Sequence, residues 1–78
     1  MTITLNGDRR DITAGTTART LVEDITGRQL SEDGTPVDGG RIGVALAVDG
    51  EVVRRGLWAG FTITDGHTVD IVTAVQGG

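Results

Sequence analysis

Apolar and polar residues alternate along the first segment of the chain. In "TITL", Ile3 and Leu5 alternate with threonines, which is the period-two pattern of a strand with one buried face. Asn6-Gly7 follows, a dipeptide suited to the positive φ angles of a tight hairpin turn. We therefore predict that the chain opens with a hairpin, whose returning strand covers Arg10 to Ile12.

The pattern changes to a helical period in the next segment, "AGTTARTLVEDITG". Its apolar residues fall at i, i+3, i+4 and i+7, which places them in one stripe along a helix. Thr16 or Thr17 is expected to cap the first amides, and Gly27 is placed to end the helix in a left-handed conformation. The predicted buried stripe consists of Ala18, Leu21, Val22 and Ile25.

A segment without periodicity follows, from Ser31 to Gly40 ("SEDGTPVDGG"). It combines the single proline of the chain with glycines and acids, a composition typical of loops. We expect a flexible loop over residues 31–40, and a binding role for it stays open.

The second half of the chain returns to strand patterns. In "VALAVDGEVV", Asp49-Gly50 is a strong hairpin signal between two strands. A connection with two bulky anchors, Trp58 and Phe61, leads to a turn at Asp65-Gly66. "TVDIVTAV" then alternates again and is the last predicted strand. Because the chain has few large side chains, we expect Trp58 in the core.

This order of elements predicts the α+β fold class and a β-grasp (ubiquitin-like) arrangement. A helical crossover between the first and last strands favours their parallel pairing at the centre of the sheet. At 78 residues, the chain is expected to form one domain, 1–78, with a mixed sheet of four to five strands packed on one helix. We expect residues 76–78 to form a flexible tail.

Composition excludes several kinds of chemistry. Cysteine is absent, so disulfides, thiolate metal sites and a cysteine nucleophile are excluded. All seven basic residues are arginine, which excludes a lysine Schiff base. The net charge of -4 argues against nucleic acid as a partner, and no apolar run is long enough to span a membrane. The start of the chain has no secretory pattern, and a cytoplasmic location is expected.

No side chain stands out as a catalyst. His67 is the single histidine, next to a turn and without a nearby serine, so we interpret it as a solvated turn residue and expect no metal site. The "DGG" at Asp38 to Gly40 lacks the residues of a phosphate loop. The acids around the helix end and the loop are read as a solvated surface: Glu23, Asp24, Glu32, Asp33 and Asp38.

The end of the chain, "TAVQGG", offers a different reactive group. Gly77 and Gly78 have no β-carbon, so the terminal carboxylate can enter a channel too narrow for other residues. A carboxylate becomes reactive when ATP converts it into an acyl-adenylate. A frayed, inert end is the plain interpretation of the same residues.

Three segments make the chain resemble the ubiquitin-like sulfur carrier proteins of bacterial thiamine (thiazole) biosynthesis. They are "GTT", "ALAVDGEVVRRGLW" and "DGHTVDIVTAVQGG", and the closing "VTAVQGG" is the most specific. The loop from Ser31 to Gly40 looks like an insertion. Family members often have proline where Arg54 stands and an acid where His67 stands.

The resemblance implies a carrier and not an enzyme, with no bound cofactor. An E1-like enzyme is expected to use ATP to adenylate Gly78, and a persulfide, supplied by a cysteine desulfurase, to convert it to a thiocarboxylate. Thiazole synthase is then expected to take the sulfur. Gln76, Gly77 and Gly78 would form the tail that enters the partner's channel.

Docking with these partners requires an exposed apolar patch. If the alternate residues of the last strands face the helix, then Ala47, Val72 and Ala74 face outward. We predict them as the docking patch. Arg54 and Arg55 could also meet acidic residues of a partner.

Three other functions stay open from the sequence. The small subunit of molybdopterin synthase has the same fold and end, although its members carry a more aromatic segment before "GG". A protein modifier would pass the activated Gly78 to a lysine of a target. A plain interaction domain would have an inert tail.

Overall fold

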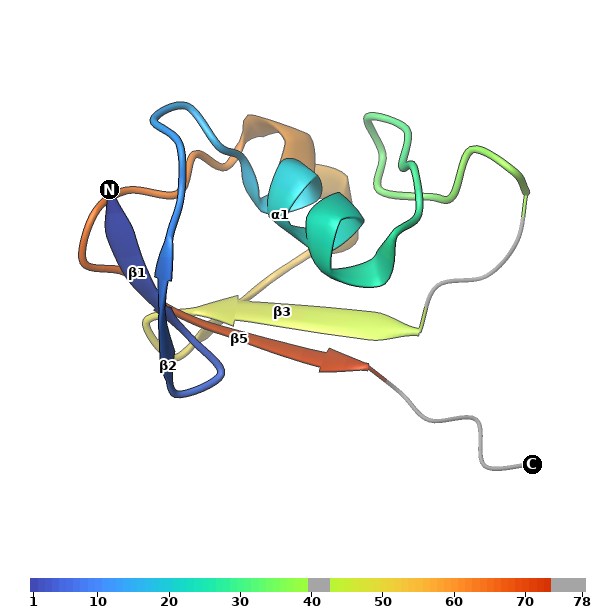
Figure 1. The fold of residues 1–78 in the computed structure, drawn as a ribbon. Helices are drawn as coiled ribbons and strands as arrows, with labels where there is room; N and C mark the ends of the chain where they lie inside the picture. Colours follow the sequence, from blue (N-terminus) through green and yellow to red (C-terminus); the bar gives the residue numbers. More distant parts are fainter. Residues whose placement is uncertain (40–42, 74–78) are drawn as a thin grey trace.

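The structure is a computed structural model of the chain, and it describes residues 1–39 and 43–73. Its elements form a single sheet with the helices on one side (Figure 1). In chain order they are β1 (Thr2–Leu5), β2 (Asp8–Asp11), α1 (Ala18–Thr26), β3 (Val44–Val48), β4 (Glu51–Val53), the 3-10 helix η1 (Arg55–Gly60) and β5 (Thr68–Thr73).

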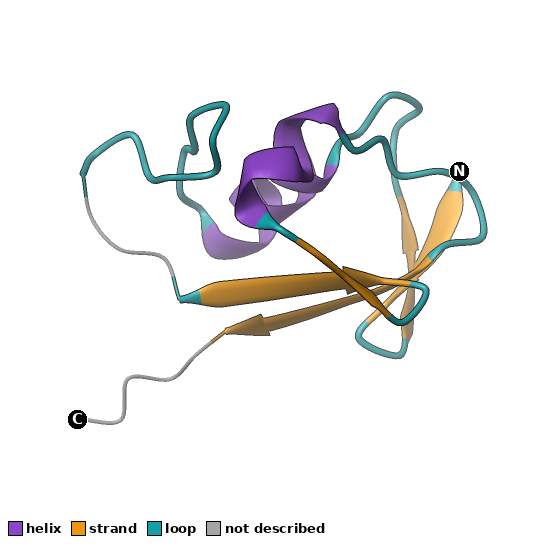
Figure 2. Cartoon of the chain, turned by 180° about the vertical axis from the view of Figure 1, so that it is seen from behind, coloured by secondary structure: helices purple, strands orange, loops and turns teal. Residues whose placement is uncertain are grey.

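The sheet has five strands in the order β2-β1-β5-β3-β4. β1 and β5 run parallel at the centre, with Leu5 opposite Val69, and all other pairs are antiparallel. α1 connects β2 to β3 and lies across one face of the sheet, as both views show (Figures 1 and 2). The predicted β-grasp arrangement, with the first and last strands paired in parallel, is confirmed.

The first hairpin has the predicted turn, but its second strand begins earlier than predicted. Asn6 and Gly7 have φ angles of 50° and 86°, as a two-residue turn of this kind requires. β2 begins at Asp8 and ends at Asp11, whereas the sequence predicted Arg10 to Ile12. Residues 8–11 carry no apolar side chain, so alternation cannot mark them. Their pairing with β1 defines the strand.

Helix α1 begins and ends as predicted. The Thr17 side chain caps it by accepting a hydrogen bond from the Thr20 amide, and Gly27 ends it with a φ of 72°. Three of the four predicted stripe residues are buried, whereas Ile25 near the end of the helix is 37% exposed. α1 therefore contributes its first two turns to the core.

The core lies between α1 and the sheet, and Trp58 of η1 is its largest side chain. The Trp58 side chain is 1% exposed, and its indole N–H donates a hydrogen bond to the Val53 carbonyl at 2.8 Å. The expected core position of Trp58 is confirmed, although the 3-10 helix that carries it was not predicted. The other buried apolar residues are Ile3, Leu5, Ala18, Leu21, Val22, Leu30, Leu46, Val48, Val53, Ile63, Val69 and Ile71.

The loop after α1 packs against η1 in its described part, residues 28–39. Gly34 is buried, and a β-carbon at this position would lie 2.3 Å from Cγ and 2.6 Å from the carbonyl oxygen of Arg55. Leu30 and Pro36 form an isolated β-bridge across the loop. The flexibility expected for residues 31–40 stays a prediction, and Gly40 lies outside the described residues.

No helix within residues 1–39 and 43–73 is both long enough and apolar enough to cross a membrane.

Candidate functional site

β5 leads directly to the predicted reactive end of the chain. It occupies the centre of the sheet, and Thr73, its last residue, pairs with Val44 of β3. Residues 74–78 lie outside the described residues, and with them the predicted tail Gln76, Gly77 and Gly78. The sheet therefore fixes the point from which the chain continues toward Gly78.

The sheet face opposite α1 carries an apolar patch beside this point. Val72 of β5 is 62% exposed and Val52 of β4 is 76% exposed. Between them lie two alanines of β3, because Ala45 pairs with Val72 and Ala47 pairs with Val52. We call these four residues the open-face patch: Ala45, Ala47, Val52 and Val72.

The predicted docking patch agrees with this surface in part. Val72 is exposed and Ala47 is half-buried on the face away from α1, while the third predicted residue, Ala74, lies outside the described residues. Ala45 and Val52 were not predicted. Alternation along β3 and β4 could have placed them on this face, but only the register of the strands makes them neighbours of Val72. The docking role stays a prediction.

Charged residues border the open-face patch. Asp70, which precedes Val72 on the same face of β5, is exposed and lies opposite Ala47. Arg54 is exposed directly after β4, whereas Arg55, the first residue of η1, lies beside Gly34 of the loop. A small apolar surface with charges at its border is typical of protein interfaces that form and separate repeatedly.

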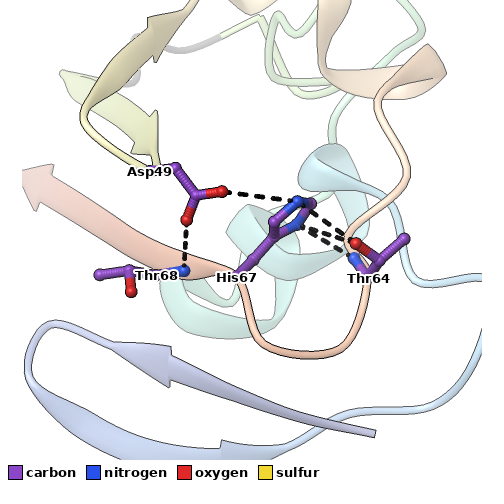
Figure 3. A network of polar contacts seen from close by, with 4 residues as sticks. All are labelled: Asp49, Thr64, His67 and Thr68. Atoms are coloured by element: carbon purple, nitrogen blue, oxygen red, sulfur yellow. Dashed lines mark hydrogen bonds and ion pairs between the residues drawn. The ribbon is translucent and has the colours of Figure 1, made fainter.

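His67 directly follows the turn, as predicted, but its side chain is only partly solvated and is held by its neighbours. Its side chain is 23% exposed, and its ring lies 6.2 Å from that of Phe61. Figure 3 shows the polar contacts: the Thr64 amide donates to Nδ1 at 3.1 Å, and Nε2 lies 3.8 Å from Asp49 Oδ2. Asp49 Oδ1 in turn accepts the Thr68 amide at 2.9 Å.

These contacts describe a structural histidine. The backbone amide at Nδ1 assigns the ring proton of a neutral histidine to Nε2, which faces a carboxylate and the Thr64 hydroxyl. The group joins the turn before β5 to the hairpin between β3 and β4. The hydroxyl beside the His67 ring belongs to Thr64, whose Oγ1 lies 3.2 Å from Nε2.

The predicted solvated acids are spread over the surface instead of gathered. Asp24 pairs with Arg10, and Asp38 pairs with Arg28 at 2.9 Å. Glu23 accepts the Leu30 amide at 2.7 Å, which ties the end of α1 to the following loop. Within the described residues, no three acids or histidines lie close enough to hold a metal ion.

Asp33 organises the described part of the loop. The Ser31 hydroxyl, the Thr35 hydroxyl and the Thr35 amide all donate to its Oδ1. These hydrogen bonds, that from Ser31 foremost, lower the pKa of Asp33 from 3.8 to about 2. The carboxylate is therefore charged at neutral pH and serves the structure of the loop.

A hollow between β2 and α1 has a volume of about 250 Å³. Ligand pockets usually measure roughly 300–1,000 Å³. Arg10 and Asp24 both line the hollow and are paired with each other. It is smaller than the usual small-molecule site, and its charges already have partners.

The fold defines the class of protein. A mixed five-stranded sheet packed against one α-helix, with its first and last strands parallel at the centre, is the β-grasp or ubiquitin-like fold. The model of the ThiS family matches residues 3–78, which is nearly the entire chain and includes both terminal glycines. The chain therefore belongs to the ThiS family, the ubiquitin-like sulfur carriers of thiamine biosynthesis.

A solved structure agrees with this assignment in its fold. The crystal structure of the thiamine biosynthesis protein ThiS from Geobacter metallireducens matches with a TM-score of 0.63 and 23% identity, and the match covers 100% of both chains. No curated protein matches the chain significantly. Membership of the family favours the thiamine carrier over the molybdopterin synthase subunit, and it implies, in general, an E1-like enzyme and thiazole synthase as partners.

Proposed function

We propose that Gly78 carries sulfur as a C-terminal thiocarboxylate and that this protein is a co-substrate, not an enzyme. The observation that carries the proposal is the family match through Gly78, at the end of a chain whose central strand leads to that residue. No cofactor needs to be bound, because the sulfur is attached covalently.

The chemistry begins at the terminal carboxylate. One of its oxygens attacks the α-phosphorus of ATP, held by an E1-like enzyme, and pyrophosphate leaves. The terminal sulfur of a persulfide then attacks the acyl carbon, and AMP leaves. A thiol cleaves the resulting sulfur–sulfur bond, which forms a disulfide and releases the thiocarboxylate. The persulfide sulfur originates from a cysteine desulfurase in this proposal.

The thiocarboxylate is a better nucleophile than a carboxylate, because sulfur is more polarizable than oxygen. It can therefore deliver sulfur to the thiazole precursor held by thiazole synthase, after which the carboxylate of Gly78 is regenerated. We place this cycle in the cytoplasm, with neither nucleic acid nor membrane as a partner.

The tail suits this chemistry by its length and its lack of side chains. Five residues follow Thr73 in the sequence. An extended chain of five residues spans at most roughly 17 Å, so the carboxylate can act well inside a partner while the sheet stays outside. Gln76 marks the approach to Gly77 and Gly78, whose missing β-carbons allow a narrow channel.

The open-face patch is the proposed docking surface for both partners. Its two valines are exposed, and Val72 lies one residue before the end of β5. A partner seated there therefore receives the tail directly. Ala74, two residues further along the chain, is proposed to belong to the same surface.

Intact mass spectrometry tests the proposal. The protein is incubated with ATP, a persulfide donor and the cognate activating enzyme. We expect a mass gain equal to the exchange of one oxygen for sulfur, located at Gly78 and absent when Gly78 is deleted. An unchanged mass, with an enzyme shown to be active on another carrier, contradicts the proposal. Covalent adducts with lysines of other proteins would instead identify a protein modifier.

A further inference from the structure

The two hairpin turns of the sheet share an unusual arrangement around β5. Asn6-Gly7 and Asp49-Gly50 are both two-residue turns with positive φ angles, 50° and 86° in the first and 51° and 86° in the second. In both turns the side chain of the first residue hydrogen-bonds to the backbone of β5. Turn side chains therefore hold β5 at its first residue, Thr68, and in its second half, at Ile71.

The side chain of Asn6 hydrogen-bonds to β5 just beyond the point where the pairing of β1 with β5 ends. The parallel register ends with Leu5 opposite Val69, and the Asn6 amide still donates to the Val69 carbonyl at 2.9 Å. The main chain then turns away into β2. From this point the side chain of Asn6 continues the ladder: its Oδ1 accepts the Ile71 amide at 2.8 Å, and its Nδ2 donates to the Ile71 carbonyl at 3.2 Å.

Asparagine is the side chain suited to this task. Its amide offers one donor and one acceptor in a plane, as a backbone peptide group does, and it tolerates the positive φ of the turn. Aspartate would place a second acceptor against the Ile71 carbonyl. Glycine would keep the turn and leave both polar groups of Ile71 without this partner.

We propose that Asn6 is a positioning residue, which clamps Ile71 and thereby sets the point from which the tail reaches into the activating enzyme. This inference rests on the proposed function. On the other side of β5, pairing with β3 continues to Thr73. Asn6 is thus the contact that holds the last part of β5 on its β1 side.

Loss of the clamp costs entropy during activation. Without it, residues beyond Val69 are held on one side only and open more often. The carboxylate can enter the enzyme only when these residues are ordered. Each residue that must be ordered again lowers the equilibrium constant for this entry by roughly tenfold. The open-face patch includes Ala45, Ala47 and Val52, which Asn6 does not contact, so docking itself continues.

Asp49 provides the control at the start of β5, although it also lies 3.8 Å from the ring of His67. Its Oδ1 accepts the Thr68 amide at 2.9 Å, and its own amide donates to the Thr68 carbonyl at 2.7 Å. Asn6→Gly and Asp49→Gly each remove one turn side chain from β5 and keep a residue that favours positive φ. Only the first removes it beside the tail.

The experiment compares both variants with the wild-type protein in two measurements. In amide hydrogen exchange by NMR, Asn6→Gly is expected to speed exchange at Ile71 by about tenfold relative to Leu46 in the neighbouring strand. In steady-state adenylation, it is expected to lower kcat by about tenfold and to change KM by less than about twofold. Asp49→Gly is expected to keep both kinetic constants near those of the wild-type protein.

The outcomes separate this inference from the function on which it rests. Unchanged exchange at Ile71, a normal kcat for Asn6→Gly, or an equal loss in both variants overturns the positioning role. Unchanged exchange would show that Asn6 does not protect the Ile71 amide. A normal kcat would show that this contact does not affect adenylation. An equal loss in both variants would show overall destabilisation of the fold. Failure of the wild-type protein to be adenylated by an active enzyme overturns the proposed function together with this role.

Discussion

The carboxylate of Asp33 is stabilised in its charged form by three donors from two neighbouring residues. Its pKa is lowered from 3.8 to about 2, first by the Ser31 hydroxyl and then by Thr35. A carboxyl whose folded pKa lies below its unfolded pKa stabilises the fold above the unfolded value. The stabilisation is lost as the pH falls through the folded value.

We therefore predict that Asp33→Asn lowers the melting temperature by a few degrees at pH 7, and that the difference shrinks between pH 4 and pH 2. Glu32→Gln, on the exposed neighbouring residue, controls for the loss of one negative charge. Thermal unfolding followed by circular dichroism over this pH series measures the effect. A difference that stays constant to pH 2 would contradict the assigned hydrogen bonds.

Single residues show where sequence reasoning reaches its limit. Trp58 could be assigned to the core because a small chain with few large side chains has to bury its largest one. The surroundings of His67 could not be predicted. Its ring meets Asp49, which is 18 positions away in sequence, and only the pairing of β3 with β5 brings the two together.

Some helices and strands could be predicted from the sequence, and others depend on tertiary contacts. β1, β5 and α1 carry apolar side chains at regular spacing, so their periods predicted them, whereas β3 and β4 were predicted from the hairpin signal Asp49-Gly50 between two apolar segments. β2 has no apolar residue and η1 is a short 3-10 helix with one buried side chain, so neither carries a periodic signal. They form because neighbouring elements pair with them or cover them.

The loop after α1 contacts η1 at Gly34, so alanine at Gly34 and at Gly39 should affect stability differently. Gly34 and Gly39 have nearly equal φ angles, 83° and 81°, but only Gly34 lacks space for a β-carbon, because of Arg55. Both substitutions by alanine carry the strain of positive φ. We predict that Gly34→Ala lowers the free energy of unfolding by about 1–3 kcal/mol more than Gly39→Ala does.

Urea unfolding followed by Trp58 fluorescence measures both glycine variants. Gly39→Ala serves as the control, since nothing lies within 4 Å of the point that its new β-carbon would occupy. Equal losses in the two variants would show that the loop does not pack against η1 in solution.

One part of the candidate site is predicted from the sequence alone, and the other depends on how the strands pair. The reactive end stays a prediction from the sequence, because Gly77 and Gly78 lie outside the described residues. The residues of the open-face patch could be predicted only in part. Alternation gives the face of each residue, but the register of β3, β4 and β5 decides that Val52 and Ala45 adjoin the predicted residues.

If the open-face patch docks and only Gly78 reacts, a carrier without its last two residues should still bind the activating enzyme and inhibit it. Deletion of Gly77 and Gly78 removes the carboxylate proposed to react and leaves the open-face patch and the core in place. We expect this variant to unfold at the wild-type temperature, to gain no sulfur and to compete with the wild-type protein for the activating enzyme. Its inhibition constant should lie within about tenfold of the wild-type KM, because the tail supplies only part of the contact.

Val72→Asp, introduced into the shortened carrier, tests whether the open-face patch is the docking surface. A charge at position 72 leaves the core intact, since Val72 is 62% exposed. The carboxylate would, however, lose its water when an apolar partner covers it, and this loss disfavours docking. We expect inhibition to weaken by at least about tenfold. Thr68→Asp places the same charge on the same strand and face, four residues before Val72, and should inhibit as before. Equal inhibition by both substituted carriers would move the docking surface elsewhere and leave the chemistry at Gly78 untouched.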